Sequence, residues 1–91
     1  MPCISMFYGI LIYMYPKDNK QHHEPHVHVI YQEFNAVFSI KTGQIIAGNL
    51  PSKKNKLVEL WIDMRQDELL ADWYLAINGE KVFNIKPLEI S

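Results

Sequence analysis

The chain has 91 residues, a net charge of −1 and a single cysteine, Cys3. This length is enough for one domain, so we expect a single domain over residues 1–91. With 48% hydrophobic and 21% charged residues, the composition excludes a disordered chain. The near-neutral charge argues against general nucleic-acid binding through a basic surface, but not against an enzyme that contacts RNA at one small site. The lone cysteine excludes an internal disulfide.

No segment has the features of a signal peptide or of a membrane span. The first residues lead into a strand-like run without a charged leader. The longest apolar run, residues 7–15, is far too short to cross a bilayer. We therefore expect a cytoplasmic protein without a membrane partner, in which Cys3 is a structural or incidental thiol.

Residues 6–15 are dominated by aromatic and β-branched side chains, which predicts a strand. Both of its faces are apolar, so the strand is either central and covered twice or part of an interface. Gly9 in its interior indicates a bulge or a close backbone approach. Residues 16–25 are polar and predict a loop.

Three further strands are expected at residues 26–31, 36–40 and 45–50. Short turns separate them, and Gly43 in the second turn can adopt a positive φ. Consecutive strands joined by tight turns predict an antiparallel meander of about four strands. Residues 82–85 are expected to form a short last strand.

Residues 50–52 carry the proline and serine of a helix start, and Asn78-Gly79 predicts the helix end. The apolar positions of this region form two groups, which at 100° per residue point in nearly opposite directions. These groups are Leu57, Leu60, Trp61 and Met64, and then Leu69, Leu70, Trp73 and Ile77. One straight helix cannot bury both against one sheet.

We therefore expect a break near residues 65–67, with Asp67 as an N-cap, or else one helix held between the sheet and a partner. The predicted fold class is α+β. A small antiparallel meander is followed by one bent helix or two consecutive helices packed on the sheet.

All four histidines lie within residues 22–28. His26 and His28 are two positions apart on a predicted strand, so their side chains project from the same face. His22 or His23 could fold back towards them from the loop. An imidazole with the ordinary pKa of about 6.5 suits proton transfer at neutral pH, and two histidines beside a phosphodiester suit metal-independent RNA cleavage. Arg65 is a candidate for stabilising the charge that develops on the phosphate.

A second use of the same residues is metal binding. The three imidazoles of His22, His26 and His28 could hold Zn²⁺ or another divalent metal with one open position. No cysteine or second histidine cluster supports this set. A third use is a protein interface lined by half-exposed histidines, without any chemistry. No cofactor is expected under the first and third uses.

Charged residues of the helical region have plainer interpretations. The acidic positions Glu59, Asp63, Asp67, Glu68 and Asp72 are expected to form a solvated helix face. Residues 53–56 include three lysines in the first helical turn, where positive charge is disfavoured. A solvated turn is expected there, and a contact that holds a lysine in place is the alternative.

Three motifs together resemble a known family. They are Met-Pro-x-Ile-Ser-x-Phe-Tyr-Gly-Ile at residues 1–10, Pro-His-x-His-Val at 25–29 and Glu-Leu-Leu-x-x-Trp at 68–73. The chain is similar to the bacterial domain-of-unknown-function family 4160 through nearly its whole length, including the closing Ile-Lys-Pro-Leu of residues 85–88. The motifs are specific in combination and weak singly.

The resemblance implies a cytosolic protein encoded beside a small protein of domain-of-unknown-function family 2442. Such pairs behave like toxin–antitoxin modules in which the family-4160 member is the usual candidate for the toxin. With the histidine cluster, this context leads us to expect a toxin that acts on RNA through His22, His26, His28 and Arg65. Its expected partner is a cognate small antitoxin-type protein, and a homo-oligomer is a further expected association.

Some positions of the chain correspond to the family's sequence pattern, and others depart from it. The family's histidine before its proline pair falls on His22, and its Pro-His-x-His-Val falls on residues 25–29. The chain departs from the pattern at Glu24, where a second proline is common, and at Tyr13, where some members carry an arginine. A missing phosphate-binding arginine weakens the nuclease interpretation. The alternatives are a non-enzymatic binding module, either antitoxin or adaptor, and a metal-dependent hydrolase that uses the same histidines.

Overall fold

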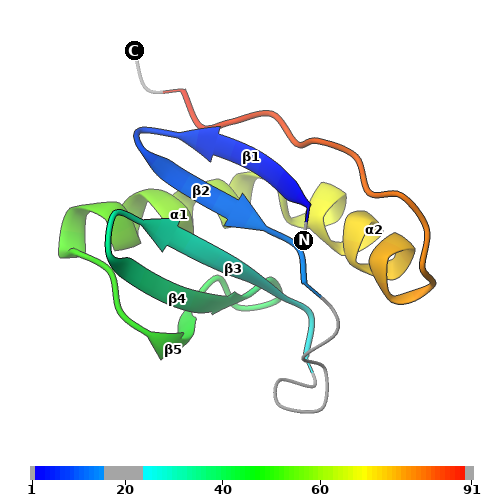
Figure 1. The fold of residues 1–91 in the computed structure, drawn as a ribbon, viewed down its shortest axis with the longest axis horizontal. Coiled ribbons are helices and arrows are strands. Elements are labelled where there is room, and N and C mark those ends of the chain that lie inside the picture. Colours follow the sequence, from blue (N-terminus) through cyan, green and yellow to red (C-terminus); the bar gives the residue numbers. More distant parts are fainter. Residues whose placement is uncertain (1, 16–23, 90–91) are drawn as a thin grey trace.

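The computed structural model describes residues 2–15 and 24–89. Five strands precede two helices along the chain (Figure 1). The elements are β1 (Cys3–Phe7), β2 (Ile10–Tyr13), β3 (His26–Tyr31), β4 (Phe34–Ser39), β5 (Ile45–Gly48), α1 (Ser52–Met64) and α2 (Gln66–Ile77).

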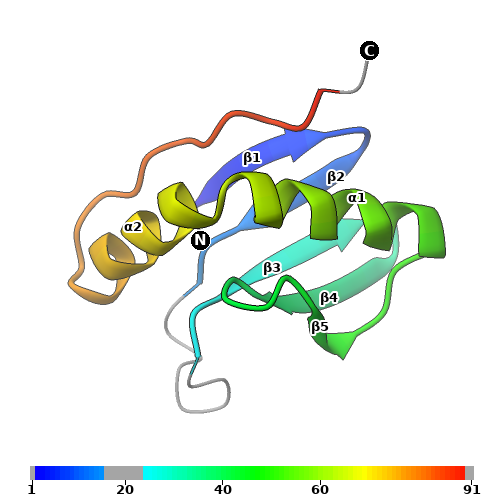
Figure 2. The same ribbon diagram turned by 180° about the vertical axis from the view of Figure 1, so that it is seen from behind.

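The strands form one sheet in the order β1-β2-β3-β4-β5, and every neighbouring pair is antiparallel. Both helices lie on one face of this sheet, as the two opposite views of Figures 1 and 2 show. The predicted α+β meander followed by helices is confirmed, with five strands in place of about four. We call the sheet side that faces the helices the core face and the other side the open face.

The additional strand arises because the predicted strand of residues 6–15 is a hairpin. Tyr8 and Gly9 both have positive φ, 49° and 78°, which is the geometry that tight two-residue hairpin turns require. Phe7 pairs with Ile10 directly across this turn. Gly9 therefore completes the turn and does not form a bulge. The Tyr31 ring approaches it closely, since an added Cβ would lie 3.3 Å from the Tyr31 Cε1.

The helical break is confirmed at Arg65, which ends α1 and precedes α2. Its φ of −117° and ψ of 21° interrupt the helical backbone. The expected N-cap at Asp67 was wrong, because Arg65 occupies the cap position and Asp67 lies inside the first turn of α2. An acidic side chain in that turn is favourable towards the helix dipole.

The predicted end of the helical region at Asn78-Gly79 is also confirmed. Gly79 has a φ of 74°, and the Glu80 N–H donates to the Leu75 carbonyl at 2.9 Å while the Gly79 N–H donates to the Ala76 carbonyl at 3.1 Å. These two bonds satisfy carbonyl groups that the helix leaves unpaired. The chain then leaves α2 in an extended strap, residues 80–89.

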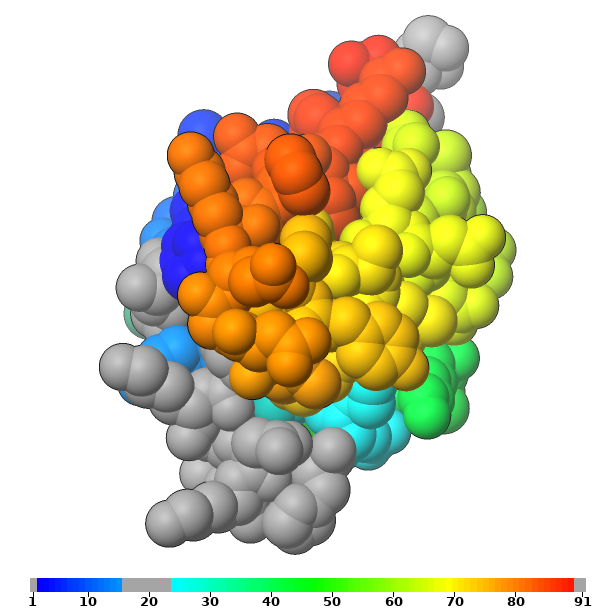
Figure 3. All heavy atoms as spheres, turned by 90° about the vertical axis from the view of Figure 1, so that its right-hand side faces the viewer, coloured from blue at the N-terminus to red at the C-terminus, as the bar shows by residue number. Residues whose placement is uncertain are grey.

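The strap runs along the outer edge of β1 (Figures 1 and 2), and in the space-filling view it lies against α2 (Figure 3). The Ile85 N–H donates to the Ile4 carbonyl at 2.8 Å, and the Trp61 indole N–H donates to the Lys86 carbonyl at 2.9 Å. Ile85 and Leu88 are buried in the main core. The strand expected at residues 82–85 does not form, but the strap covers the β1 edge, which would otherwise offer unpaired backbone groups.

The core lies between the core face of the sheet, the helices and the strap. Trp61 is fully buried at its centre and packs against the Phe7 ring with centroids 5.3 Å apart. Around this pair lie aliphatic side chains of every element except β5, with Ile45 of β5 packed at the margin. None of the described helices is long and apolar enough to cross a membrane.

Asp72 is buried, contrary to the expected solvated acidic face. Its carboxylate accepts the Phe83 N–H of the strap at 3.0 Å, while the other carboxylate oxygen has no hydrogen-bond partner. Burial raises the pKa of Asp72, the Phe83 hydrogen bond opposes the shift, and the nearby Glu68 charge adds to it. The ionised form is thus less favourable in the folded chain than in the unfolded chain.

We expect the variant Asp72→Asn to be more stable than the parent chain at neutral pH. A raised folded pKa means that folding loses stability as pH rises through the interval between the unfolded and the folded pKa. Asparagine keeps an oxygen that can accept the Phe83 N–H, but it carries no charge. Thermal melts from acid to neutral pH should show the advantage of Asp72→Asn growing with pH, while Asp63→Asn on the exposed side should show no such trend. An advantage of Asp72→Asn that is equal at all pH values would contradict this account.

Candidate functional site

The candidate site lies at one end of the open face, where β3 begins. Cross-strand pairing aligns Tyr13, His28, Val37 and Ala47 in one row across four strands. The alternate residues, such as Val27 and Val29, face the core and are fully buried. This alternation places the partly exposed His28 on the open face, whereas the fully buried His26 ring lies beside Trp73 of α2.

The rings of His26 and His28 are neighbours. Their centroids are 5.3 Å apart and their planes meet at 65°, in an edge-to-face arrangement. The two rings differ in their surroundings, because His26 is fully buried whereas His28 is partly exposed. The pair therefore offers one ring to solvent, with a second ring behind it.

His26 is held on two sides. Its ring packs against the Trp73 ring of α2 with centroids 4.9 Å apart, and its Nδ1 lies 2.8 Å from the Glu24 carbonyl oxygen. A carbonyl oxygen can only accept, so Nδ1 carries the proton. In the neutral ring the other nitrogen, Nε2, then carries the lone pair.

The backbone that leads into His26 is clamped to the end of β4. The Ser39 hydroxyl donates to the Glu24 carboxylate at 2.9 Å and accepts the Thr42 N–H at 3.3 Å. The Ile40 N–H donates to the Pro25 carbonyl at 2.9 Å. Since Ser39 is also the cross-strand partner of His26, the same strand pair sets the position of the ring and of its hydrogen-bond acceptor.

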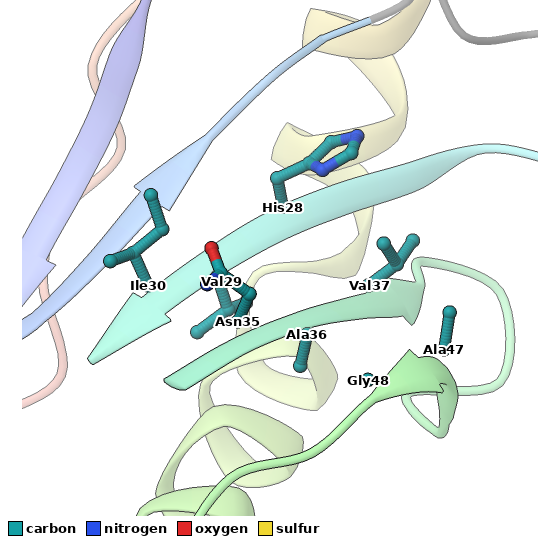
Figure 4. A pocket seen from close by; sticks show the side chains of 8 residues that line it. All are labelled: His28, Val29, Ile30, Asn35, Ala36, Val37, Ala47 and Gly48. Carbon is teal, nitrogen blue, oxygen red and sulfur yellow. The ribbon is translucent and has the colours of Figure 1, made fainter. Parts of the chain in front are cut away.

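His28 stands at the margin of a hollow in the open face. The hollow has a volume of about 300 Å³ and is lined mainly by apolar atoms of β3, β4 and β5 (Figure 4). In that view the side chains of His28, Val37 and Ala47 rise from the same side of the sheet. The Tyr15 ring lies edge-on to the His28 ring, with centroids 5.5 Å apart. A ligand in the hollow would meet the His28 imidazole directly.

The structure brings together two of the four predicted catalytic residues. His22 lies outside the described residues, as does His23. Arg65 lies at the junction of α1 and α2, where its guanidinium donates to Glu68 at 3.2 Å, and the structure gives it no contact with either described histidine. Within residues 2–15 and 24–89, no three histidine, cysteine or acidic side chains are placed to hold a metal ion. The predicted metal set includes His22, so it extends beyond the described chain.

Sequence reasoning missed Glu24, Ser39 and Trp73 as members of the site. Ser39 and Trp73 reach His26 only through strand pairing and helix packing, so no local pattern indicates them. Among the first-turn lysines, Lys54 makes the contact that was the alternative to a solvated turn. Its ammonium donates to the Tyr8 carbonyl at 3.3 Å and lies 5.0 Å from the centre of the Tyr31 ring. That cation–π contact offsets the unfavourable helix dipole.

A family model described as a domain of unknown function (DUF4160) matches residues 9–74, which is more than half of the chain. The matched residues include His26, His28 and Trp73, together with Ser39 and the Glu24 carboxylate to which its hydroxyl donates. No curated protein and no solved structure matches the chain.

Proposed function

The chain belongs to the DUF4160 family, and from this premise we propose that it is the toxin of a bacterial toxin–antitoxin pair that cleaves RNA in the cytoplasm. The observation that carries the proposal is the histidine pair, in which a partly exposed His28 is backed by a buried His26. The resemblance of the sequence to a family with toxin–antitoxin context supplies the biological setting.

His28 is the group that would contact RNA. In this reaction its imidazole takes the proton of a ribose 2′-hydroxyl while that oxygen attacks the adjacent phosphorus. The bond from phosphorus to the 5′-oxygen breaks, and that oxygen takes up a proton from solvent. The products are a 2′,3′-cyclic phosphate end and a 5′-hydroxyl end.

His26 acts in this scheme as a positioning residue. Full burial keeps it from contacting RNA, and its bond to the Glu24 carbonyl fixes which nitrogen carries the proton. Arg65 has no part in the proposal, because its guanidinium is engaged with Glu68 at the helix junction. The cognate partner in this proposal is a small antitoxin-type protein.

The test is inducible expression of the chain alone, followed by RNA cleavage assays with the purified protein. We expect growth arrest from the parent chain and a loss of cleavage by a factor of about 10²–10⁴ in His28→Ala, the usual size of an acid–base contribution. Analysis of the RNA ends should find cyclic phosphate. Because His28 is partly exposed, the variant should fold, which circular dichroism and a thermal melt would verify.

The matched control is Tyr74→Ala, which removes an aromatic ring that is 57% exposed on α2, away from the sheet. It should retain full activity. A parent chain that neither arrests growth nor cleaves RNA would overturn the proposal. So would a His28→Ala variant that is as toxic as the parent.

A second candidate function is a non-enzymatic binding module, either an antitoxin or an adaptor. The observation that favours it is the open face, where exposed Met6 and half-buried Leu11 and Ile30 have no covering layer among the described elements. Co-expression with the product of an adjacent gene would discriminate between the candidates. A stable complex formed by a chain that lacks toxicity alone would favour the binding module.

A further inference from the structure

Strand register arranges the open face in two parallel rows of side chains. The first row runs Met6, Leu11, Ile30, Asn35 from β1 to β4, and the second runs Cys3, Tyr13, His28, Val37, Ala47 from β1 to β5. Neither row contains Asp, Glu, Lys or Arg. A surface that is apolar over most of its area and lacks formal charge is typical of an interface core.

The first row carries a projection at one end and a depression at the other. Met6 of β1 is 63% exposed, more than any other large hydrophobic residue of the strands. The hollow of about 300 Å³ lies over β3, β4 and β5, where Ile30 and Asn35 of the first row form part of its lining (Figure 4). Met6 and the hollow therefore share a row but lie several strands apart.

We propose that two copies of this chain pack open face to open face about a two-fold axis that runs along the strands between β2 and β3. Such an axis brings β1 of each copy over β4 of the other and β2 over β3. Met6 then enters the hollow of the second copy, and Leu11 meets Ile30. In the second row, Tyr13 meets His28. Every contact occurs twice, as a two-fold interface requires.

A second copy suits this face better than other occupants. Identical charged faces would repel across a two-fold axis, and the two rows have no charge to repel. RNA that covered both rows would need several cations for its phosphates, which these rows lack, whereas the proposed cleavage involves only one phosphodiester at His28. Face-to-face sheets lie about 10 Å apart with interdigitated side chains, which matches a flexible methionine seated in a shallow hollow.

The expected dimer is weak, because a five-stranded face is only about 20 Å wide at the usual strand spacing. An interface of this width lies at the low end of the areas that specific protein interfaces bury, so we expect a dissociation constant in the micromolar range. The inference does not depend on the proposed function. Where both hold, the dimer covers His28 and RNA cleavage per chain falls as the protein is concentrated.

The test is sedimentation velocity of the purified chain over a wide concentration range. We expect a monomer–dimer equilibrium for the parent chain and dimerisation weakened by roughly tenfold or more in Met6→Lys, because the substitution brings a charge into an apolar hollow. The matched control is Met64→Lys, which changes a methionine that is 54% exposed at the end of α1. That variant should dimerise like the parent chain.

A parent chain that stays monomeric at every concentration overturns the proposal. Equal dimerisation of Met6→Lys and Met64→Lys also overturns it. A parent chain that is monomeric alone but sediments as a complex after addition of a different protein would assign the face to that protein, and the two-copy proposal would fail.

Charge complementation tests the register of the two faces. Ala47 lines the hollow, so Ala47→Glu should also weaken dimerisation. Mixing Met6→Lys with Ala47→Glu should restore association, because the mixed dimer has one lysine–glutamate contact and one parental contact. Pairing through the β5 edge would instead be disrupted by Ile46→Lys and would gain nothing from mixing. Either of those results contradicts the face-to-face arrangement.

Discussion

Replacing Gly48 by alanine is expected to lower the free energy of unfolding by about 2–5 kcal/mol, combining a left-handed backbone cost with steric overlap. Gly48 has a φ of 75° at the end of β5. An added Cβ would overlap the Asn35 carbonyl oxygen and lie 2.9 Å from the Ala36 Cα, both of them backbone atoms of β4. Since neither atom can move without displacing β4, the melting temperature should fall by more than about 10 °C.

Gly79→Ala is the matched control for this effect. Gly79 has nearly the same φ, 74°, but an added Cβ would meet no atom within 4 Å. Only the left-handed backbone cost applies, so we expect a loss of about 1–2 kcal/mol. Urea unfolding followed by circular dichroism would measure both variants. Equal losses at the two glycines would mean that the close approach of β4 and β5 is not what requires Gly48.

Trp61→Ala should have a similarly large effect, with a loss of about 3–5 kcal/mol. Trp61 is fully buried, packs on Phe7 and ties the strap through its bond to the Lys86 carbonyl. Removing it leaves a cavity at the junction of the sheet, α1 and the strap. Domains of this kind are stable by only about 5–15 kcal/mol, so the variant should lie close to unfolding at room temperature.

Trp61→Phe separates the two roles of this side chain. It retains an aromatic ring beside Phe7 but cannot donate to Lys86, so we expect a smaller loss of about 1–3 kcal/mol. Hydrogen exchange at the Ile85 N–H should become faster, because the strap loses one of the hydrogen bonds that anchor it near that residue. Unchanged exchange in Trp61→Phe would show that burial of Ile85 and Leu88 holds the strap without the indole bond.

Local sequence signals were sufficient for much of the fold. Turn residues and alternation predicted the meander, the positive φ at Gly43 and the helix end at Asn78-Gly79. The two opposed apolar faces of the helical region predicted the break at Arg65. Alternation along β3 also predicted that His26 and His28 are neighbours, and their ring centroids lie 5.3 Å apart. Each of these features depends on residues a few positions apart, so the sequence carries the information locally.

The hairpin at Tyr8-Gly9 was not predictable from the same signals. An apolar run of ten residues is equally compatible with one long strand or two short strands, and tyrosine at positive φ is uncommon. Only the pairing of Phe7 with Ile10 across the turn decides between them. The strap is a comparable case, because one bond to Ile4 anchors residues 80–89 beside β1 without a strand ladder.

By itself, the sequence determined an α+β meander followed by one bent helix or two helices, and a pair of neighbouring imidazoles. The tertiary structure decided which imidazole is accessible. Trp73 packs on His26, and the Ser39 hydroxyl binds the carboxylate of Glu24, whose carbonyl accepts the His26 hydrogen bond. His28 lies beside the hollow. Arg65 was assigned to this site from its chemistry and lies instead at the helix junction. The physical reason is that periodicity and turn chemistry act over a few residues, whereas burial and strand register depend on contacts between distant parts of the chain.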